Sequence, residues 1–174
     1  MPKVLRVVKG APLWMNRNPL PWIGQGDIAA DYLRDFHTKD NKLSLWKVEE
    51  DRSNLDRTIA AYVSMWSRPD NFSCLLFPTE VLDHLTLIRE PQPGNTQDEV
   101  ANFWHFNLVE LTGSKIVALV RNILDSEYDI VIRDIEELSN SLAHSVQAEH
   151  IPFRKLSKPW QEHLNRRLGQ QGLL

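Results

Sequence analysis

The sequence predicts an α+β fold, with a small mixed sheet and helices in the N-terminal half and a helical C-terminal half. Strand-like runs of β-branched or alternating residues occur mainly before residue 90, and two capping-box patterns occur after it. Between them, residues 90–96 contain two prolines and a glycine, which marks a connection. Neither half is long enough to bury a comfortable core alone. We therefore expect one domain, with an α/β half at 1–89, a linker at 90–96 and a helical half at 97–174.

Strands and helices are expected to alternate in the first half. The β-branched run at 4–8, the alternating run at 43–49 and the short apolar run at 72–77 predict three strands. Asp27 is a candidate cap for a helix over about 28–37, and Ser53 or Asn54 for a helix through about Ser67. Residues 79–85 predict a helical turn, followed by an extended segment up to Glu90.

The second half contains the most site-like segment, Thr112-Gly-Ser-Lys115. A phosphate loop needs a glycine five residues before a Gly-Lys pair, but Ser114 separates Gly113 from Lys115 and no earlier glycine stands at that spacing. Apolar residues recur at three- and four-residue intervals across the quartet, which predicts one long helix over about 97–125, capped at Thr96. Within it, Gly113 would either admit a close neighbour or divide the helix, with Ser114 as the new cap.

The rest of the chain predicts one extended segment and two helices. Residues 129–133 are brief and β-branched, and Asp134 opens a second capping box and a helix to about Gln147. Ser157 is a candidate cap for a short basic helix that has Pro159 in its first turn.

Charge is distributed unevenly along the chain. Residues 1–27 carry a net charge of +3 and residues 150–174 carry +4, while the whole chain carries −3, so the middle is strongly acidic. The favoured interpretation is that the basic ends dock on the acidic body, where opposite fields attract. The alternative is that the C-terminal tail contacts an acidic partner or a nucleic acid, but the tail lacks interleaved aromatic residues.

Glu80, Asp83 and His84 are the candidate metal ligands. The three residues fall on one turn of the short helix predicted at 79–85, and two carboxylates with an imidazole can ligate a divalent ion. The alternative is an exposed polar face beside the apolar Val81 and Leu82.

Motifs for covalent catalysis and for cofactors are absent from the sequence. It contains no His-Glu-x-x-His, no Gly-x-Ser-x-Gly and no Gly-x-Gly-x-x-Gly. The single Cys74 lies in an apolar run and is expected to be a buried small hydrophobe. We expect no cofactor, and the catalytic residues of any enzyme activity stay unknown at this level.

Tryptophan and arginine outside the periodic segments are the candidate partner-binding residues. Trp and Arg are enriched in binding hot spots. The candidates are Trp14, Arg17, Trp22, Arg154 and Trp160. The prolines at 12, 19 and 21 forbid a regular element in the loop at 11–26, so its tryptophans either pin the loop to the body or face a partner.

These observations favour a regulatory or accessory module that binds another protein or itself. The first alternative is a small metal-assisted hydrolase or nuclease built around Glu80, Asp83 and His84, and the second is a weak nucleic-acid binder that uses the basic tail. Nucleic acid is the disfavoured partner. No run approaches the roughly 18 apolar residues of a membrane helix, and the N-terminus lacks a long apolar signal region, so we expect no membrane contact and a cytoplasmic location.

Overall fold

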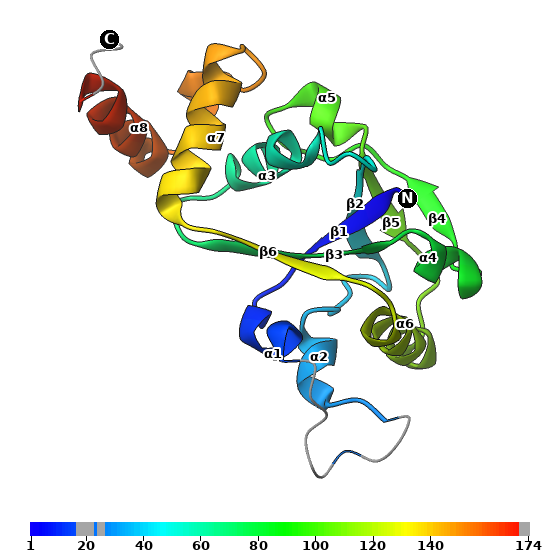
Figure 1. Ribbon diagram of the computed structural model, residues 1–174. Coiled ribbons are helices and arrows are strands. Elements are labelled where there is room, and N and C mark those ends of the chain that lie inside the picture. The colour runs from blue at the N-terminus through cyan, green and yellow to red at the C-terminus, as the bar shows by residue number, and fades with distance from the viewer. Residues whose placement is uncertain (17–22, 24–26, 171–174) are drawn as a thin grey trace.

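One antiparallel sheet lies between two groups of helices (Figure 1). The computed structural model describes residues 1–16, 23 and 27–170. In that part of the chain six strands lie in the order β4-β5-β2-β1-β3-β6, and every neighbouring pair is antiparallel. The strands are β1 Lys3–Val7, β2 Leu43–Val48, β3 Phe72–Pro78, β4 Arg89–Pro91, β5 His105–Leu108 and β6 Asp129–Arg133. The predicted α+β class is confirmed.

The helices divide between the two faces of the sheet (Figure 1). The first group is α1 Ala11–Met15, α2 Ala30–Arg34, α4 Glu80–His84 and α6 Gly113–Asp125. The second group is α3 Leu55–Val63, α5 Glu99–Asn102, α7 Ile135–Gln147 and α8 Lys158–Gln170, with the 3-10 turn η1 Phe153–Lys155 before α8. Helix α8 packs on α7, so it is the helix of this group that lies farthest out.

Each helix group covers a separate apolar core. Alternate residues of the same strands pack into one core or the other. Leu75 and Phe77 of β3 pack into the core under α1, α2, α4 and α6. Cys74 and Leu76 of the same strand pack into the core under α3, α7 and α8. Successive side chains of a strand point to opposite faces, so a strand covered on both faces must be apolar throughout. This explains why residues 74–77 are a continuous apolar run.

Local sequence signals placed most elements of the first half and the helix α7. The three strands predicted there are β1, β2 and β3, with ends that agree within one or two residues. Asp134 caps α7 as a full capping box, since its side chain accepts from the Glu137 amide at 2.8 Å and the Glu137 side chain accepts from the Asp134 amide at 3.1 Å. Helix α2 is shorter than predicted and begins after Ala29 without a side-chain cap, and the Asp27 side chain accepts from the adjacent Ile28 amide at 2.8 Å.

The predicted helix over 97–125 is wrong, because the segment forms three elements. The short helix α5 ends at Asn102, strand β5 follows, and α6 begins at Gly113. The cap of α5 is Asp98 and not Thr96. The cap of α6 is Thr112, whose hydroxyl accepts from the Lys115 amide at 3.3 Å.

Strand β5 forms because it has partners on both sides, and its one buried polar residue is satisfied by them. It pairs with β2 and with β4. Asn107 accepts a hydrogen bond from the Ser44 hydroxyl at 3.1 Å and donates one to Gln92. The buried side chain of Asn107 therefore costs this strand little, since buried polar groups are tolerated when they are hydrogen-bonded.

The division into an α/β half and a helical half is also corrected. Strands β5 and β6 come from the second half and lie in the same sheet as the others, and the sheet is antiparallel, not mixed. The connection at 90–96 is packed in place, because the Gly94 amide donates to the Asn102 carbonyl at 2.8 Å.

Two glycines test this arrangement through opposite effects on stability. A Cβ at Gly94 would lie 2.8 Å from both the Asn102 side chain and the Trp46 ring, whereas a Cβ at Gly113 meets nothing within 4 Å. We expect Gly94→Ala to lower the free energy of unfolding by about 1–3 kcal/mol through overpacking. We expect Gly113→Ala to raise it by about 0.4–1 kcal/mol by restricting the unfolded chain. Urea unfolding of both variants checks this, and a stabilised Gly94→Ala protein would contradict the packing of that connection.

Candidate protein-interaction surface

Trp14 does not face a partner, which corrects the expectation for this residue. Its side chain is fully buried in α1, with its ring against those of Tyr32, Phe36 and Tyr128 at centroid distances of 4.8, 5.7 and 5.9 Å. Its indole nitrogen donates to the Asp35 carboxylate at 2.9 Å. The alternative interpretation fits, in which this tryptophan pins its segment to the body. The expectation that the prolines forbid a regular element here is wrong for residues 11–15, because Pro12 stands in the first turn of α1, where proline is tolerated.

Trp160 is buried as well, so it is not available to a partner either. Its ring is fully buried in the core between α7 and α8 and meets the His163 ring edge-on. Its indole nitrogen has no hydrogen-bond partner among the described residues. The short basic helix therefore docks through an aromatic side chain, not through its charges alone.

The other three predicted partner-binding residues have different outcomes. Arg17 and Trp22 lie outside the described residues. Arg154 lies in η1 and is exposed, next to the exposed Lys155.

The predicted metal ligands lie on α4 but do not form a cluster. Glu80, Asp83 and His84 are all exposed, and Asp83 pairs with Arg89 at 2.5 Å. Within the described residues no three His, Cys, Asp or Glu side chains are placed to hold one metal ion together. This arrangement matches the alternative of an exposed polar face beside buried Val81 and Leu82.

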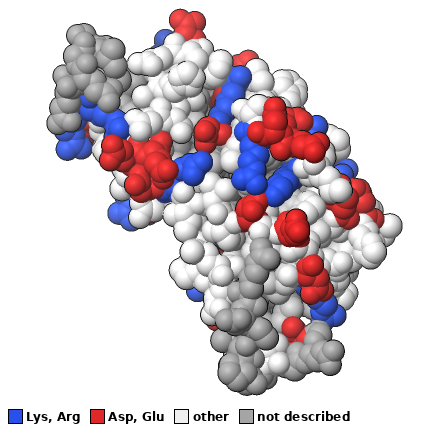
Figure 2. All heavy atoms as spheres, in the orientation of Figure 1, with Lys and Arg blue, Asp and Glu red and all other residues white. Residues whose placement is uncertain are grey.

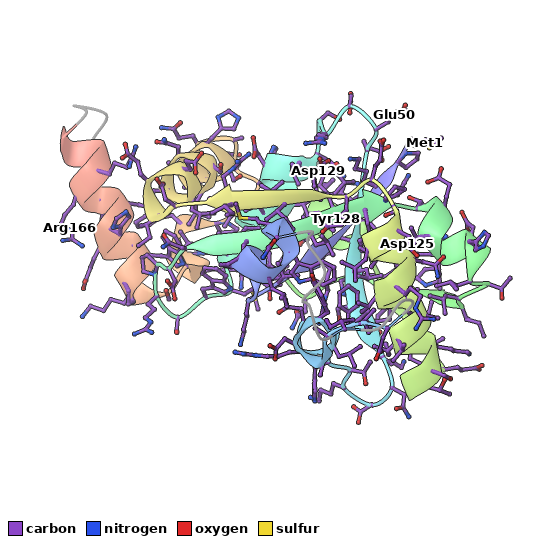
Figure 3. The ribbon with its side chains drawn as sticks, turned by 60° about the horizontal axis from the view of Figure 1, so that its bottom comes forward. Met1, Glu50, Asp125, Tyr128, Asp129 and Arg166 are labelled. Carbon is purple, nitrogen blue, oxygen red and sulfur yellow. The ribbon has the colours of Figure 1, made fainter. Side chains whose placement is uncertain are left out.

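The basic ends pair in part with the acidic body, as the favoured interpretation of the charge pattern expects. Lys3 contacts Asp129 at 2.5 Å, and Arg167 contacts Glu136 at 3.3 Å. Arg166 extends outward from α8 (Figure 3). On the face drawn in Figure 2, acidic and basic side chains are interspersed and do not form one basic patch.

Among the described helices, none is both long and apolar enough to cross a bilayer.

The described nucleophiles and bases offer little for covalent chemistry. Burial raises the pKa of the Cys74 thiol to about 12, so the thiol stays protonated at neutral pH. A polar hollow of about 460 Å³ between α3 and α7 contains His144, His150 and Ser145. These side chains are not hydrogen-bonded to one another in the described structure, so they do not form a nucleophile and base pair as they stand.

The feature that sequence reasoning missed is a group of exposed apolar side chains around α5. Phe103 is 77% exposed, Val100 is 49% exposed and Met65 is 48% exposed. Val100 and Phe103 are three residues apart, joined by a backbone hydrogen bond of 3.1 Å, and Gln97 reaches the Met65 sulfur at 3.5 Å. We call the surface formed by Met65, Gln97, Val100 and Phe103 the α5 surface. Exposed large apolar residues that lie together mark binding sites more often than single ones do.

A buried ion pair holds the α5 surface in place. Asp98 is 1% exposed and accepts two hydrogen bonds from Arg57, at 2.6 and 2.9 Å, and a third from the Ala101 amide at 3.0 Å. The Arg57 guanidinium also lies 5.8 Å from the centroid of the Trp104 ring. Burial raises the pKa of Asp98, but the hydrogen bonds and charge of Arg57 and the Ala101 amide outweigh it, so the pKa is lowered overall.

A shallow hollow adjoins this surface at Met65. It has a volume of about 420 Å³ and is lined by Met65, Trp66, Ser67, Arg68 and Asp70. The hollow and the α5 surface together present Phe, Met, Trp and Arg, which are side chains enriched in the centres of protein interfaces. This part of the molecule can bind an apolar side chain and hydrogen-bond its polar neighbours.

The signal in the sequence was present but was assigned to the wrong place. Val100, Phe103 and Trp104 are among the apolar residues whose three- and four-residue spacing predicts the long helix over about 97–125. Once α5 ends at Asn102, no helix continues to cover Phe103, and its ring is left in solvent.

Comparison of the chain with protein-family models, with curated proteins and with solved structures finds no match.

The burial of Trp14 predicts a large effect of removing its ring. We expect Trp14→Ala to lower the free energy of unfolding by about 3–5 kcal/mol, because it leaves a cavity and removes one of the three hydrogen bonds to the buried Asp35 carboxylate. The melting temperature should fall by on the order of 10 °C. The matched control is Met15→Ala in the same helix, since Met15 is 61% exposed. Calorimetry of both variants checks this, and equal melting temperatures would show that Trp14 is not part of the core.

The Arg57–Asp98 pair predicts a stability difference that depends on pH. Asp98→Asn keeps a cap for α5 but removes the charge, and we expect it to cost about 3 kcal/mol at pH 7, since Arg57 loses its buried partner. The pKa of Asp98 is lower in the folded chain, so its stabilisation is complete above the unfolded pKa of about 3.9 and is lost as pH falls through the folded value. Urea unfolding should therefore show a constant gap between wild type and variant from pH 7 to 5 that narrows below pH 4. A gap that grows on acidification would contradict this pairing.

Proposed function

We propose that this chain is a cytoplasmic protein-binding module, regulatory or accessory to another protein, and that it contacts that protein through the α5 surface. The observation that carries the proposal is the exposure of Phe103, whose ring is 77% accessible, together with the exposure of Val100, to which its amide is hydrogen-bonded, and of Met65, which Gln97 contacts. A phenylalanine ring in water forgoes about 1.5–3 kcal/mol that burial would supply. The exposed fractions of the three apolar side chains of this surface sum to less than two whole side chains, so covering them all would recover about 3–5 kcal/mol.

The size of this gain indicates the kind of complex the surface supports. Association costs roughly 4–15 kcal/mol in lost freedom, and a dissociation constant of about 1 μM corresponds to about −8 kcal/mol net. Burial of three apolar side chains supplies part of the free energy that such a complex needs. The hollow beside Met65 supports a larger contact, because a partner side chain seated there would bury Trp66 and reach Arg68 and Asp70.

The rigidity of the surface supports the same proposal. Asp98 caps α5 and is bound by Arg57, and these two contacts hold the backbone that carries Val100 and Phe103 in position. A binding surface that is already ordered loses less conformational entropy on association. The expected partner is therefore a polypeptide that presents a large apolar side chain flanked by polar groups.

The test compares baits that differ at one exposed residue. The full chain, its Phe103→Asp variant and the control Ile88→Asp are each immobilised, and bound proteins are quantified by mass spectrometry. Ile88 is a suitable control because it is 46% exposed and lies outside the α5 surface. The exposed position of Phe103 predicts that Phe103→Asp changes the free energy of unfolding by no more than about 0.5 kcal/mol.

The expected result is a protein that both wild type and the Ile88 variant retain and the Phe103 variant loses. Calorimetry with that purified protein should then show at least a tenfold weaker affinity for Phe103→Asp, which corresponds to about 1.4 kcal/mol. Identical sets of bound proteins for all three baits would refute a role for the α5 surface.

A further inference from the structure

Strand β6 forms one edge of the sheet, and half of its backbone groups point away from the sheet. The Val8 amide donates to the Ser73 carbonyl at 3.0 Å, so the Ser73 backbone points to β1. Backbone direction alternates along an antiparallel strand, and therefore Cys74 points to β6, where it pairs with Val131. By the same alternation the amides and carbonyls of Ile130 and Ile132 point outward from the edge.

The outward groups of β6 have almost no partners within the described chain. The only hydrogen bond found for them is a long one of 3.4 Å, from the Arg133 side chain to the Ile132 carbonyl. The Ile132 side chain is itself 48% exposed. Such an edge is a template for another strand.

The opposite edge of the sheet, at β4, is protected against pairing with another strand. The edge at β6 is not protected in this way. Strand β4 has three residues and ends at Pro91, and its Glu90 is engaged by Lys42 at 2.7 Å. Short length, proline and charge are the usual means of blocking an edge. Strand β6 has five residues, no proline, and three consecutive β-branched side chains.

The sequence of β6 is complementary to itself in the antiparallel direction. It reads Asp-Ile-Val-Ile-Arg. If two copies pair about Val131, Ile130 of each copy lies opposite Ile132 of the other, and Asp129 lies opposite Arg133. Opposite charges and β-branched pairs across strands are both stabilising. Parallel pairing would place like charges together.

The side chains around the two ends of β6 add to this complementarity. Asp129 contacts Lys3 and Arg52, each at 2.5 Å, so this end holds two cations and one anion. Arg133 contacts Asp56 at 3.4 Å and Glu137 at 3.9 Å, so the other end holds one cation and two anions. Antiparallel pairing of two copies brings the cationic end of each onto the anionic end of the other.

The figures show that this edge faces outward. Figure 1 is viewed toward the β6 edge of the sheet, with one helix group above the strands and the other below them, and Figure 3 labels Asp129 at the start of β6. In the space-filling view from the same direction, acidic and basic side chains lie intermixed across the middle of this face (Figure 2). Helix α5 belongs to the helix group above the sheet in Figure 1, and it leads into β5, which lies near the opposite edge of the sheet from β6.

We propose that β6 pairs with β6 of a second copy of this chain, antiparallel and centred on Val131, to form a symmetric dimer with one continuous sheet. The outward backbone groups of Ile130 and Ile132 then bond to those of the other copy, and Asp129 and Arg133 form two reciprocal ion pairs. This proposal rests on the edge of the sheet and stands or falls independently of the α5 surface.

The decisive experiment reverses one charge at a time and then mixes the variants. Sedimentation velocity of the full chain should give the mass of two chains. Asp129→Arg and Arg133→Asp each place like charges opposite each other twice, and we expect each variant alone to associate at least tenfold more weakly. An equimolar mixture restores both opposite-charge pairs and should regain the dimer, which a merely structural role of either residue would not produce.

Two further measurements separate lost association from lost folding. Glu90→Arg, the same kind of reversal on the protected edge strand, should leave the dimer unchanged, and the melting temperature of each variant reports its folding. Hydrogen exchange should show the Ile130 and Ile132 amides protected in wild type and exchanging quickly in either single variant. The Val131 amide, which faces β3, should stay protected in all of them.

Three results would overturn the proposal. The first is a wild-type chain that stays monomeric at every concentration tested. A monomeric chain whose β6 edge binds a different protein would count as this result. The second is a dimer that neither single variant weakens. The third is a pair of folded monomeric variants whose mixture does not associate.

Discussion

The constraint on which the structure depends is that one sheet must fill two cores. Strand β1 pairs with β2 on one side and β3 on the other, so it lies at the middle of the sheet. Its Val4 packs into the core under α1 and α6, and its Leu5 packs into the core under α3 and α7. Alternate residues of each central strand belong to different cores. A shift of one position in the pairing of such a strand would therefore move its side chains from each core into the other.

This constraint explains why the irregular segment after β1 is held by a carboxylate and not by more apolar contact. Asp35 is 6% exposed and accepts from the Lys9 amide at 2.8 Å, the Gly10 amide at 3.2 Å and the Trp14 indole. A buried carboxylate is tolerated when several donors satisfy it. The three bonds fix the turn that sends α1 across the sheet, and the ring of Trp14 can then fill the core between α2 and β6.

The sequence was sufficient where structure follows from neighbouring residues and insufficient where it depends on distant ones. The capping box at Asp134 and the apolar run of β3 are local signals, and both elements were predicted with good ends. Strand β5 depends on β2 and β4, which lie far away in the chain, and its local spacing of apolar residues resembled a helix. The candidate site failed for a related reason. Trp14 and Trp160 were candidates both for partner binding and for pinning their segments to the body, and they are buried, while the exposed Phe103 lies in the segment predicted as one long helix.

The two proposed contacts lie on different parts of the sheet, and together they address the modest affinity expected of the α5 surface. A dimer joined through β6 carries two α5 surfaces on one rigid body, because the sheet continues from one copy to the other. When a partner has two binding segments, the second contact becomes intramolecular, and overall affinity can exceed that of one contact by about 10²–10⁴. A surface of three apolar side chains and a shallow hollow, too small for tight binding alone, is then sufficient for stable attachment to a repeated or dimeric partner. Attachment would depend on the edge strand as strongly as on Phe103, although β6 itself contacts no part of that partner.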